Sequence, residues 1–355
     1  MGAPKIQNQT PFQFAAIFAA DIDGQPLFTP LLKASFAVEL NGRLAPVKRQ
    51  PPILPGGEWW GAPDSSSLKF EAEATLVKPA SDVVLLGHVF PSHAGAVETK
   101  VGIKVGPVRK VVHVTGDRWW IKRRGMMTMT APRSIDRIPL RWERAFGGWD
   151  RTASDPQEHR CEARNPVGTG FRVGSRKEEL EVALPNLEDP QNMIRSFDDR
   201  PPPAGFGFIS HHWHPRAGYA GTYDLAWNKS RRPLLPLDFD RRFLNAAPAD
   251  QIVTGYLRGN ERVEISNASE RGRLQFALPG NGAAPVLDVV LQDGTSQTLM
   301  PVLDTLIIDT DNHVVSMLWR ASLRVTEIPS GVRSVFVQWE GDWVAPDYRR
   351  FGIPS

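Results

Sequence analysis

Hydrophobic and polar residues alternate over short stretches in the first and last thirds of the chain. In one stretch every second residue is apolar: Leu32, Ala34, Phe36, Val38 and Leu40. The residues between them are mostly polar: Lys33, Ser35, Ala37 and Glu39. A period of two predicts a β-strand with one face in the core and the other mostly in solvent. Asp23-Gly24 and Asn41-Gly42 flank this strand and predict hairpins, because both central residues of such turns need positive φ.

Similar patterns predict most of the remaining strands. In the first third they cover 68–76, 82–90, 100–105 and 111–114, and no helix of ordinary length is expected before about Pro132. After Gln251 they predict two hairpins, 286–292 with 295–302 and 303–309 with 314–325. In segment 314–325 one face carries Val315, Met317, Trp319, Ala321, Leu323 and Val325, and the other carries Arg320, Ser322 and Arg324. Val335, Val337 and Trp339 predict a last strand before a tail.

The middle of the chain follows neither period. Between residues 134 and 199 we expect loops and a short helix over 176–183, with Ser175 as N-cap and Glu178 in a capping box. A second short helix is expected after Asp189. Segment 200–251 is rich in proline, glycine and aromatic residues, and its aromatic content predicts ordered, irregular backbone and not a disordered linker. Ordered irregular segments of this length are uncommon and are usually functional.

Together these patterns predict a mainly β fold of β-sandwich-like sheets, with short antiparallel strands and few short helices. Residues 1–325 are expected to form a single β-rich domain with an irregular insert at about 134–251. Residues 326–355 are expected to be a C-terminal strand and tail. The length of 355 residues is ample for a substantial core.

Charge and cysteine content narrow the functional classes. The formal net charge is only +3, and basic doublets stand beside Asp238 and Asp240, so nucleic acid is not an expected partner. The apolar run 12–20 is too short to span a bilayer and lacks the basic leader of a secretory signal. Cys161 is the single cysteine, which excludes an internal disulfide. The expected location is the cytoplasm, without a membrane partner.

His211, His212 and His214 are the candidate metal ligands. In a strand His212 and His214 would share a face, and imidazole is a common ligand of zinc or copper. No third ligand follows at a characteristic spacing, so we favour a structural role and expect no cofactor. A metal-dependent hydrolase that uses this cluster with Asp224 remains the alternative.

The other candidate motifs also favour structural roles. Four aspartates, Asp224, Asp238, Asp240 and Asp250, could include an acid–base pair, but we expect them to pair with nearby arginines. The sequence Gly168-Thr169-Gly170 lacks the remainder of a phosphate loop and predicts a turn. In Trp59-Trp60 and Trp119-Trp120 one member of each pair should face the core. Exposed members could serve a carbohydrate-binding β module, a further alternative. No motif amounts to an active site.

Several ordered motifs resemble one bacterial family. They are RWERAFGG (141–148), ARNPVGTGF (163–171), LPNLEDP (184–190), PPAGFGF (202–208), AGTYDLAW (220–227) and LPLDFDRRFLNAAPADQ (235–251). Together with flanking pieces they resemble the family catalogued as domain of unknown function 2169, over about residues 15–325. The resemblance implies a link with type VI secretion. Such proteins are thought to be adaptors or chaperones that load toxic effectors, often PAAR-bearing, onto the VgrG spike.

The resemblance therefore implies a non-enzymatic adaptor whose partners are a secreted effector and the VgrG spike. Segment 200–251, with loop 141–171, is expected to form the face that holds the effector, because Trp, Tyr and Arg are enriched at interface hot spots. The residues expected to make exposed contacts are Trp149, Trp213, Tyr219, Arg231 and Arg232. An equally open interpretation is that these motifs only hold the fold together.

Overall fold

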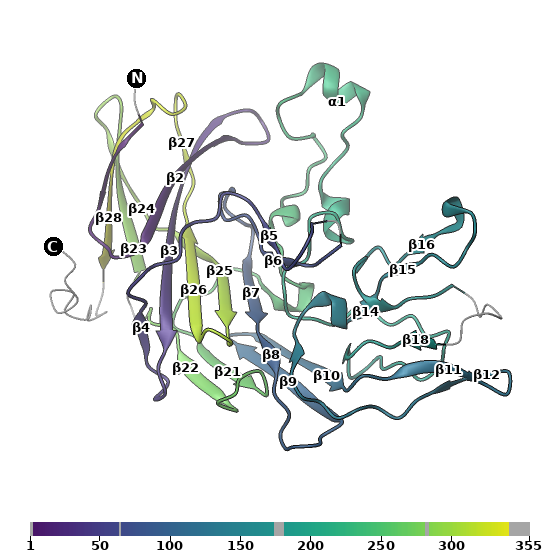
Figure 1. The fold of residues 1–355 in the computed structure, drawn as a ribbon. Helices are drawn as coiled ribbons and strands as arrows, with labels where there is room; N and C mark the ends of the chain where they lie inside the picture. The colour runs from purple at the N-terminus through teal and green to yellow at the C-terminus, as the bar shows by residue number, and fades with distance from the viewer. Residues whose placement is uncertain (1–2, 64, 174–180, 281–283, 341–355) are drawn as a thin grey trace.

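The protein is represented by a computed structural model that describes residues 3–63, 65–173, 181–280 and 284–340. Figure 1 shows strands throughout, and α1 (Leu225–Ser230), the single α-helix of the described residues, lies on a projecting segment. The prediction of a mainly β fold with few short helices is confirmed. Neighbouring strands are mostly antiparallel. Three pairs are parallel: β1 (Lys5–Asn8) with β28 (Val332–Glu340), β14 (Phe146–Gly147) with β17 (Thr169–Gly170), and β25 (Val302–Asp309) with β7 (Ser81–Leu86).

The largest sheet forms the centre of the molecule. Its strands lie in the order β2 (Gln13–Ala20), β3 (Pro26–Val38), β26 (Val314–Arg320), β25 (Val302–Asp309), β7 (Ser81–Leu86) and β20 (Ile252–Val253). The short strands β4 (Leu44–Pro46) and β27 (Leu323–Arg324) also pair with β3. The segment predicted as one strand over 314–325 is therefore divided into β26 and β27.

Two smaller sheets cover one face of this central sheet. One has the order β19 (Leu187–Glu188), β10 (Val108–Thr115), β9 (Glu98–Val105), β21 (Arg262–Ser266) and β22 (Leu274–Ala277). The other has the order β1 (Lys5–Asn8), β28 (Val332–Glu340), β23 (Ala284–Leu291) and β24 (Ser296–Leu299). The predicted hairpin around Asp293-Gly294 joins β23 and β24, and the predicted last strand is β28.

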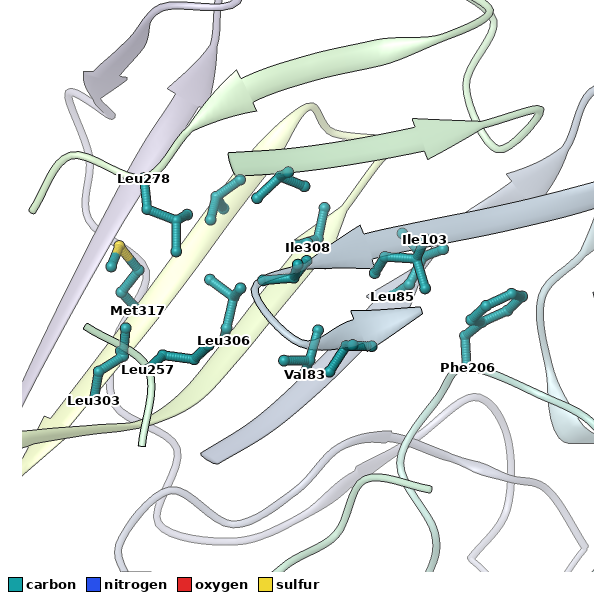
Figure 2. Packing of buried hydrophobic residues seen from close by; sticks show 14 of the residues in the cluster. Val83, Leu85, Ile103, Phe206, Leu257, Leu278, Leu303, Leu306, Ile308 and Met317 are labelled. Carbon is teal, nitrogen blue, oxygen red and sulfur yellow. The ribbon is translucent and has the colours of Figure 1, made fainter. Parts of the chain in front are cut away.

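The main core lies between these sheets. Figure 2 shows Val83 and Leu85 of β7 beside Leu306 and Ile308 of β25, with Ile103 of β9 nearby. Val335 and Val337 of β28 are fully buried in the same cluster. Burial of this much apolar surface is the main favourable term in folding.

The opposite face of the central sheet is also covered. A second cluster packs Val84 and Ile307 from this sheet against Phe208 and Ala246 from the irregular segment. The expectation that the polar face of the predicted strand 32–40 lies in solvent is therefore wrong, since Lys33 is only 4% exposed. The polar residues Ser35, Ser316 and Arg320 are buried on this face as well.

Other strand boundaries differ from the prediction. Leu40 is 87% exposed instead of buried, because β3 ends at Val38 and a turn over residues 39–43 follows. In the predicted strand 68–76 only β6 (Leu68–Phe70) forms, paired with β5 (Glu58–Trp59). The described residues before Pro132 form no helix, as predicted.

Both helix predictions between residues 175 and 200 are wrong for the residues that the structure describes. Residues 174–180 lie outside the described part, and the predicted helix end forms the strand β18 (Glu181–Ala183). After Asp189 the backbone makes turns, because the Asp189 carboxylate accepts hydrogen bonds from the Gln191 amide and the Asn192 side chain. β18 joins β11 (Trp119–Arg123) and β12 (Met126–Met129) in a small third sheet.

Segment 200–251 is ordered and irregular, as predicted. Besides α1 it contains only 3₁₀-helices, at Arg216–Tyr219, Arg241–Leu244 and Ala249–Gln251. Three aromatic anchors, Phe206, Phe208 and Trp213, are almost completely buried. The apolar run 12–20 contributes to β2, and no helix in the described residues is long and apolar enough to cross a membrane.

Candidate functional site

The motif LNAAPADQ is joined to the central sheet by buried hydrogen bonds. The Asn245 amide nitrogen lies 2.9 Å from the Ala80 carbonyl oxygen and 2.9 Å from Asp82 Oδ1. The Ala246 backbone N–H and the Lys78 ammonium group bind the other Asp82 oxygen at 2.9 and 2.7 Å. A buried carboxylate needs such donors, because an unpaired charge is costly in the interior. These motif residues are therefore used to hold the segment on the sheet.

The motif NPVGTG has a similar internal role. Asn165 is fully buried, and its amide nitrogen donates to the carbonyl groups of Trp142 and Phe146. Thr169 and Gly170 form the two-residue strand β17, paired with β14 (Phe146–Gly147), and not only a turn. A Cβ at Gly168 would lie 2.4 Å from the Asn165 amide nitrogen, so this crossing has no room for a side chain. The NPVGTG segment therefore allows close packing of two chain segments and does not form a phosphate loop.

Within the part of the chain that the structure describes, Asp240 alone of the four aspartates pairs with an arginine, Arg242, at 2.5 Å. Asp224 caps α1 by accepting the Trp227 N–H, and Asp238 accepts two hydrogen bonds from Thr222. Asp250 pairs with Lys110 at 2.8 Å. All four therefore have structural partners, although three of these partners are not the arginines that were expected.

The three histidines are close in sequence, but their side chains are not arranged as a set of metal ligands. The rings of His211 and His212 have centroids 3.8 Å apart. Burial, and then the neighbouring His212, lower the pKa of His211. His214 precedes a cis peptide bond to Pro215, and its backbone N–H donates to the Ala163 carbonyl. The described part of the chain contains no group of three His, Cys, Asp or Glu side chains arranged for a metal ion.

The tryptophan pairs behave differently from each other. Trp120 is buried against Phe197, while Trp119 is half-buried under the Arg133 guanidinium group, as the alternation predicts. In the other pair neither ring is fully buried, and Arg141 covers Trp60 with its guanidinium carbon 3.7 Å from the ring centroid. A cationic side chain thus covers one face of Trp60 and one face of Trp119. A sugar-binding platform would need that ring face to be free.

Three exposed apolar side chains lie on residues 220–240, which we call the arm. In Figure 1 the arm projects at the top of the molecule and carries α1. Its exposed apolar side chains are Leu225 (76% exposed), Leu237 (77%) and Tyr223 (53%). The arm also contains three basic and three acidic side chains. The aperiodic mixture of leucine, proline and arginine was the sequence signal for this surface, but Leu225 and Leu237 were not identified from it.

Internal contacts hold the arm in one shape. At its base, the Tyr219 carbonyl accepts the Asp240 N–H at 3.0 Å. Near its tip, the Trp227 indole N–H donates to the Leu234 carbonyl at 2.9 Å. The Arg231 guanidinium group donates to the Ile22 carbonyl, which ties the arm to the turn between β2 and β3. The exposed leucines thus sit on an ordered support.

The five residues expected to make exposed contacts have different environments. Trp213 is only 6% exposed and packs edge-on against Trp142, so the expectation that it is exposed is wrong. Trp149 is 43% exposed on β15 (Trp149–Asp150), in a hairpin with β16 (Arg160–Cys161). The other three, Tyr219, Arg231 and Arg232, lie on the arm or at its base. Figure 1 places the β15–β16 hairpin to the right of the arm, so the structure does not bring all five together.

A cleft of about 670 Å³ lies beside the irregular segment. One wall is formed by residues 109–112 of β10. The rest includes five prolines: Pro190, Pro202, Pro203, Pro215 and Pro248. Lys110 extends toward the Phe206 ring, 5.5 Å from its centroid, and burial lowers the pKa of Lys110 while Asp250 opposes the shift. This cleft was not identified from the sequence.

Comparison with known proteins gives one match. The model of the family described as an uncharacterized protein conserved in bacteria, DUF2169, matches residues 23–320. No curated protein and no solved structure matches the chain. The matched region contains the buried motifs, the arm and the cleft. Because the match covers most of the chain, the protein belongs to the bacterial DUF2169 family.

Proposed function

We propose that this protein is a non-enzymatic adaptor that binds a type VI secretion effector and helps to load it onto the VgrG/PAAR spike. The observation that carries the proposal is the arm, on which Leu225 and Leu237 are held in solvent. Apolar side chains on a rigid support are suited to binding, because little conformational entropy is lost when a partner covers them. The resemblance of the sequence motifs to type VI secretion proteins supplies the class of partner.

The arm carries charges of both signs. Lys229, Arg231 and Arg232 lie between Leu225 and Leu237 in sequence, while Asp224 and Asp238 directly flank the two leucines, and the Arg231 side chain is already used to fix the arm. A complementary effector surface would therefore combine an apolar centre with a polar rim of mixed charge. The buried motif residues act in this proposal as the framework that positions the arm and do not themselves contact the effector.

The first test is co-purification of the tagged full-length protein from its native host, with mass spectrometry of the retained proteins. Recovery of a PAAR-bearing effector or of VgrG is the expected result. A protein recovered without any component of the secretion system would contradict the adaptor role.

The second test examines the arm itself. We expect Leu225→Asp combined with Leu237→Asp to reduce effector retention by at least about tenfold, because two leucines would each lose about 1.5–3 kcal/mol of burial in the interface. Leu40→Asp is the matched control, since Leu40 is even more exposed, in the turn after β3. All these variants should keep the melting temperature of the wild type. Undiminished retention by the arm variant would refute this surface as the contact.

A further inference from the structure

Strand β10 has one edge that is only partly paired. It pairs with β9 along its whole length, from Val108 to Thr115. On its other edge β19 pairs with it at two positions only, His113↔Glu188 and Val114↔Leu187. The residues from Val108 to Val112 have no strand neighbour on that side among the described residues.

The direction of the backbone groups follows from two hydrogen bonds. The Thr115 N–H donates to the Asn186 carbonyl on the β19 side, and the Gly116 N–H donates to the Val97 carbonyl on the β9 side, both at 2.9 Å. Successive residues of a strand direct their backbone groups to opposite edges. The N–H and C=O groups of Arg109 and Val111 therefore point away from β9, and neither makes a backbone hydrogen bond on that side to the described residues.

The reason that β19 stops is a proline. Continuing the register from His113↔Glu188 would place Val111 opposite Pro190, which has no N–H to donate. The Asp189 carboxylate then bonds the Gln191 amide and turns the chain away. Strand β19 therefore ends at Glu188, and it leaves this edge of β10 from Val108 to Val112 unpaired among the described residues.

This open edge lies in the proline-lined cleft. Residues 109–112 form one wall, and Pro190, Pro202, Pro203, Pro215 and Pro248 contribute to the others. Prolines offer apolar surface without N–H donors, so their backbone cannot donate to the free carbonyl groups on this edge of β10. Two donor–acceptor pairs, spaced two residues apart along a strand, match the backbone of an extended polypeptide.

We propose that this cleft binds an extended segment of a partner protein, which adds a strand to the free edge of β10. Strand addition of this kind draws affinity from main-chain hydrogen bonds, and side-chain pockets supply selectivity. The proposal rests on the proposed function in one respect: the segment that binds in the cell belongs to the effector. It gives the adaptor a second contact, separate from the arm.

The test uses random 12-residue peptides displayed on phage and selected on the full-length protein, followed by affinity measurements on synthetic copies. In the variant Val111→Pro the edge loses one N–H, whereas the ladder with β9 is kept because that N–H points away from it. Val111 is 49% exposed, which leaves room for the ring. Val111→Thr is the matched control that retains the donor. Ala249→Trp places a large side chain in the cleft from a lining residue outside β10.

We expect the selection to enrich strand-forming peptides that bind about tenfold or more weakly to Val111→Pro and Ala249→Trp, and normally to Val111→Thr. Failure to enrich peptides, or peptides that bind both blocked variants as they bind the wild type, would overturn the proposal. Self-association that Val111→Pro abolishes would also overturn it, in favour of a second copy of the chain.

The two proposals fail in different ways. Effector retention at the wild-type level by both blocked variants would overturn the open edge and leave the adaptor role intact. Absence of any effector from the wild-type purification would contradict the adaptor role, while the peptide measurements would still decide whether the edge accepts a strand.

Discussion

Replacement of Asn245 by alanine separates a structural role of the family motifs from a contact role. The Asn245 side chain is buried and donates two hydrogen bonds of 2.9 Å, one to a neutral carbonyl and one to the Asp82 carboxylate. A neutral hydrogen bond contributes about 0.5–1.5 kcal/mol and one to a charged group about 1.5–3 kcal/mol. Asp82 keeps its contacts with Lys78 and Ala246, so its charge is not left alone. We expect the free energy of unfolding to fall by about 2–4.5 kcal/mol.

Equilibrium urea unfolding, followed by tryptophan fluorescence, measures this loss. The midpoint should fall by the lost free energy divided by the slope m, and m itself should not change. Asn228→Ala is the control, because Asn228 is exposed on α1, and it should stay within about 0.5 kcal/mol of the wild type. Effector retention by Asn245→Ala should equal that of the wild type at a temperature where both are folded.

Two results would refute this reasoning. An unfolding free energy for Asn245→Ala within about 0.5 kcal/mol of the wild type would show that the buried hydrogen bonds do not hold the segment. Loss of effector retention without loss of stability would make Asn245 a contact residue, contrary to its burial.

Two further predictions concern the arm and the acid stability. Gly221 has φ +82, and a Cβ there would lie 2.9 Å from both Pro236 Cβ and Asp238 Oδ1, so Gly221→Ala should destabilise the arm by at least about 1 kcal/mol. Hydrogen exchange should accelerate over residues 220–240 with little change elsewhere, and unchanged exchange there would contradict the strain. Burial raises the pKa of Asp150, but hydrogen bonds from Thr152 and Val173 outweigh it and leave the pKa lowered. This stabilisation is present above the unfolded pKa of about 3.9 and is lost as pH falls through the lowered folded value. Asp150→Asn should therefore melt below the wild type at pH 7, and the difference should shrink at about pH 2; a constant difference would contradict this linkage.

The alternation of residues was sufficient for the fold class and for several strands. Glycine-containing turns connect the strands of predicted hairpins, as at Asp293-Gly294. Of the paired tryptophans, Trp120 is in the core and Trp119 lies nearer the surface, as a period of two requires. The aromatic content of segment 200–251 also predicted its order, since Phe206 and Phe208 anchor it. These properties depend on neighbours in sequence, which pattern analysis can read.

Tertiary structure alone decided what covers each face and edge. Lys33 and Arg320 occupy polar positions of alternating strands, yet both are buried, because segments far away in sequence cover that face. Pairing partners are equally nonlocal: β28 lies between β1 and β23, and β10 has an edge that β19 fills only in part. A period of two assigns side chains to two faces but carries no information about which strand lies beside which, or where an edge remains free.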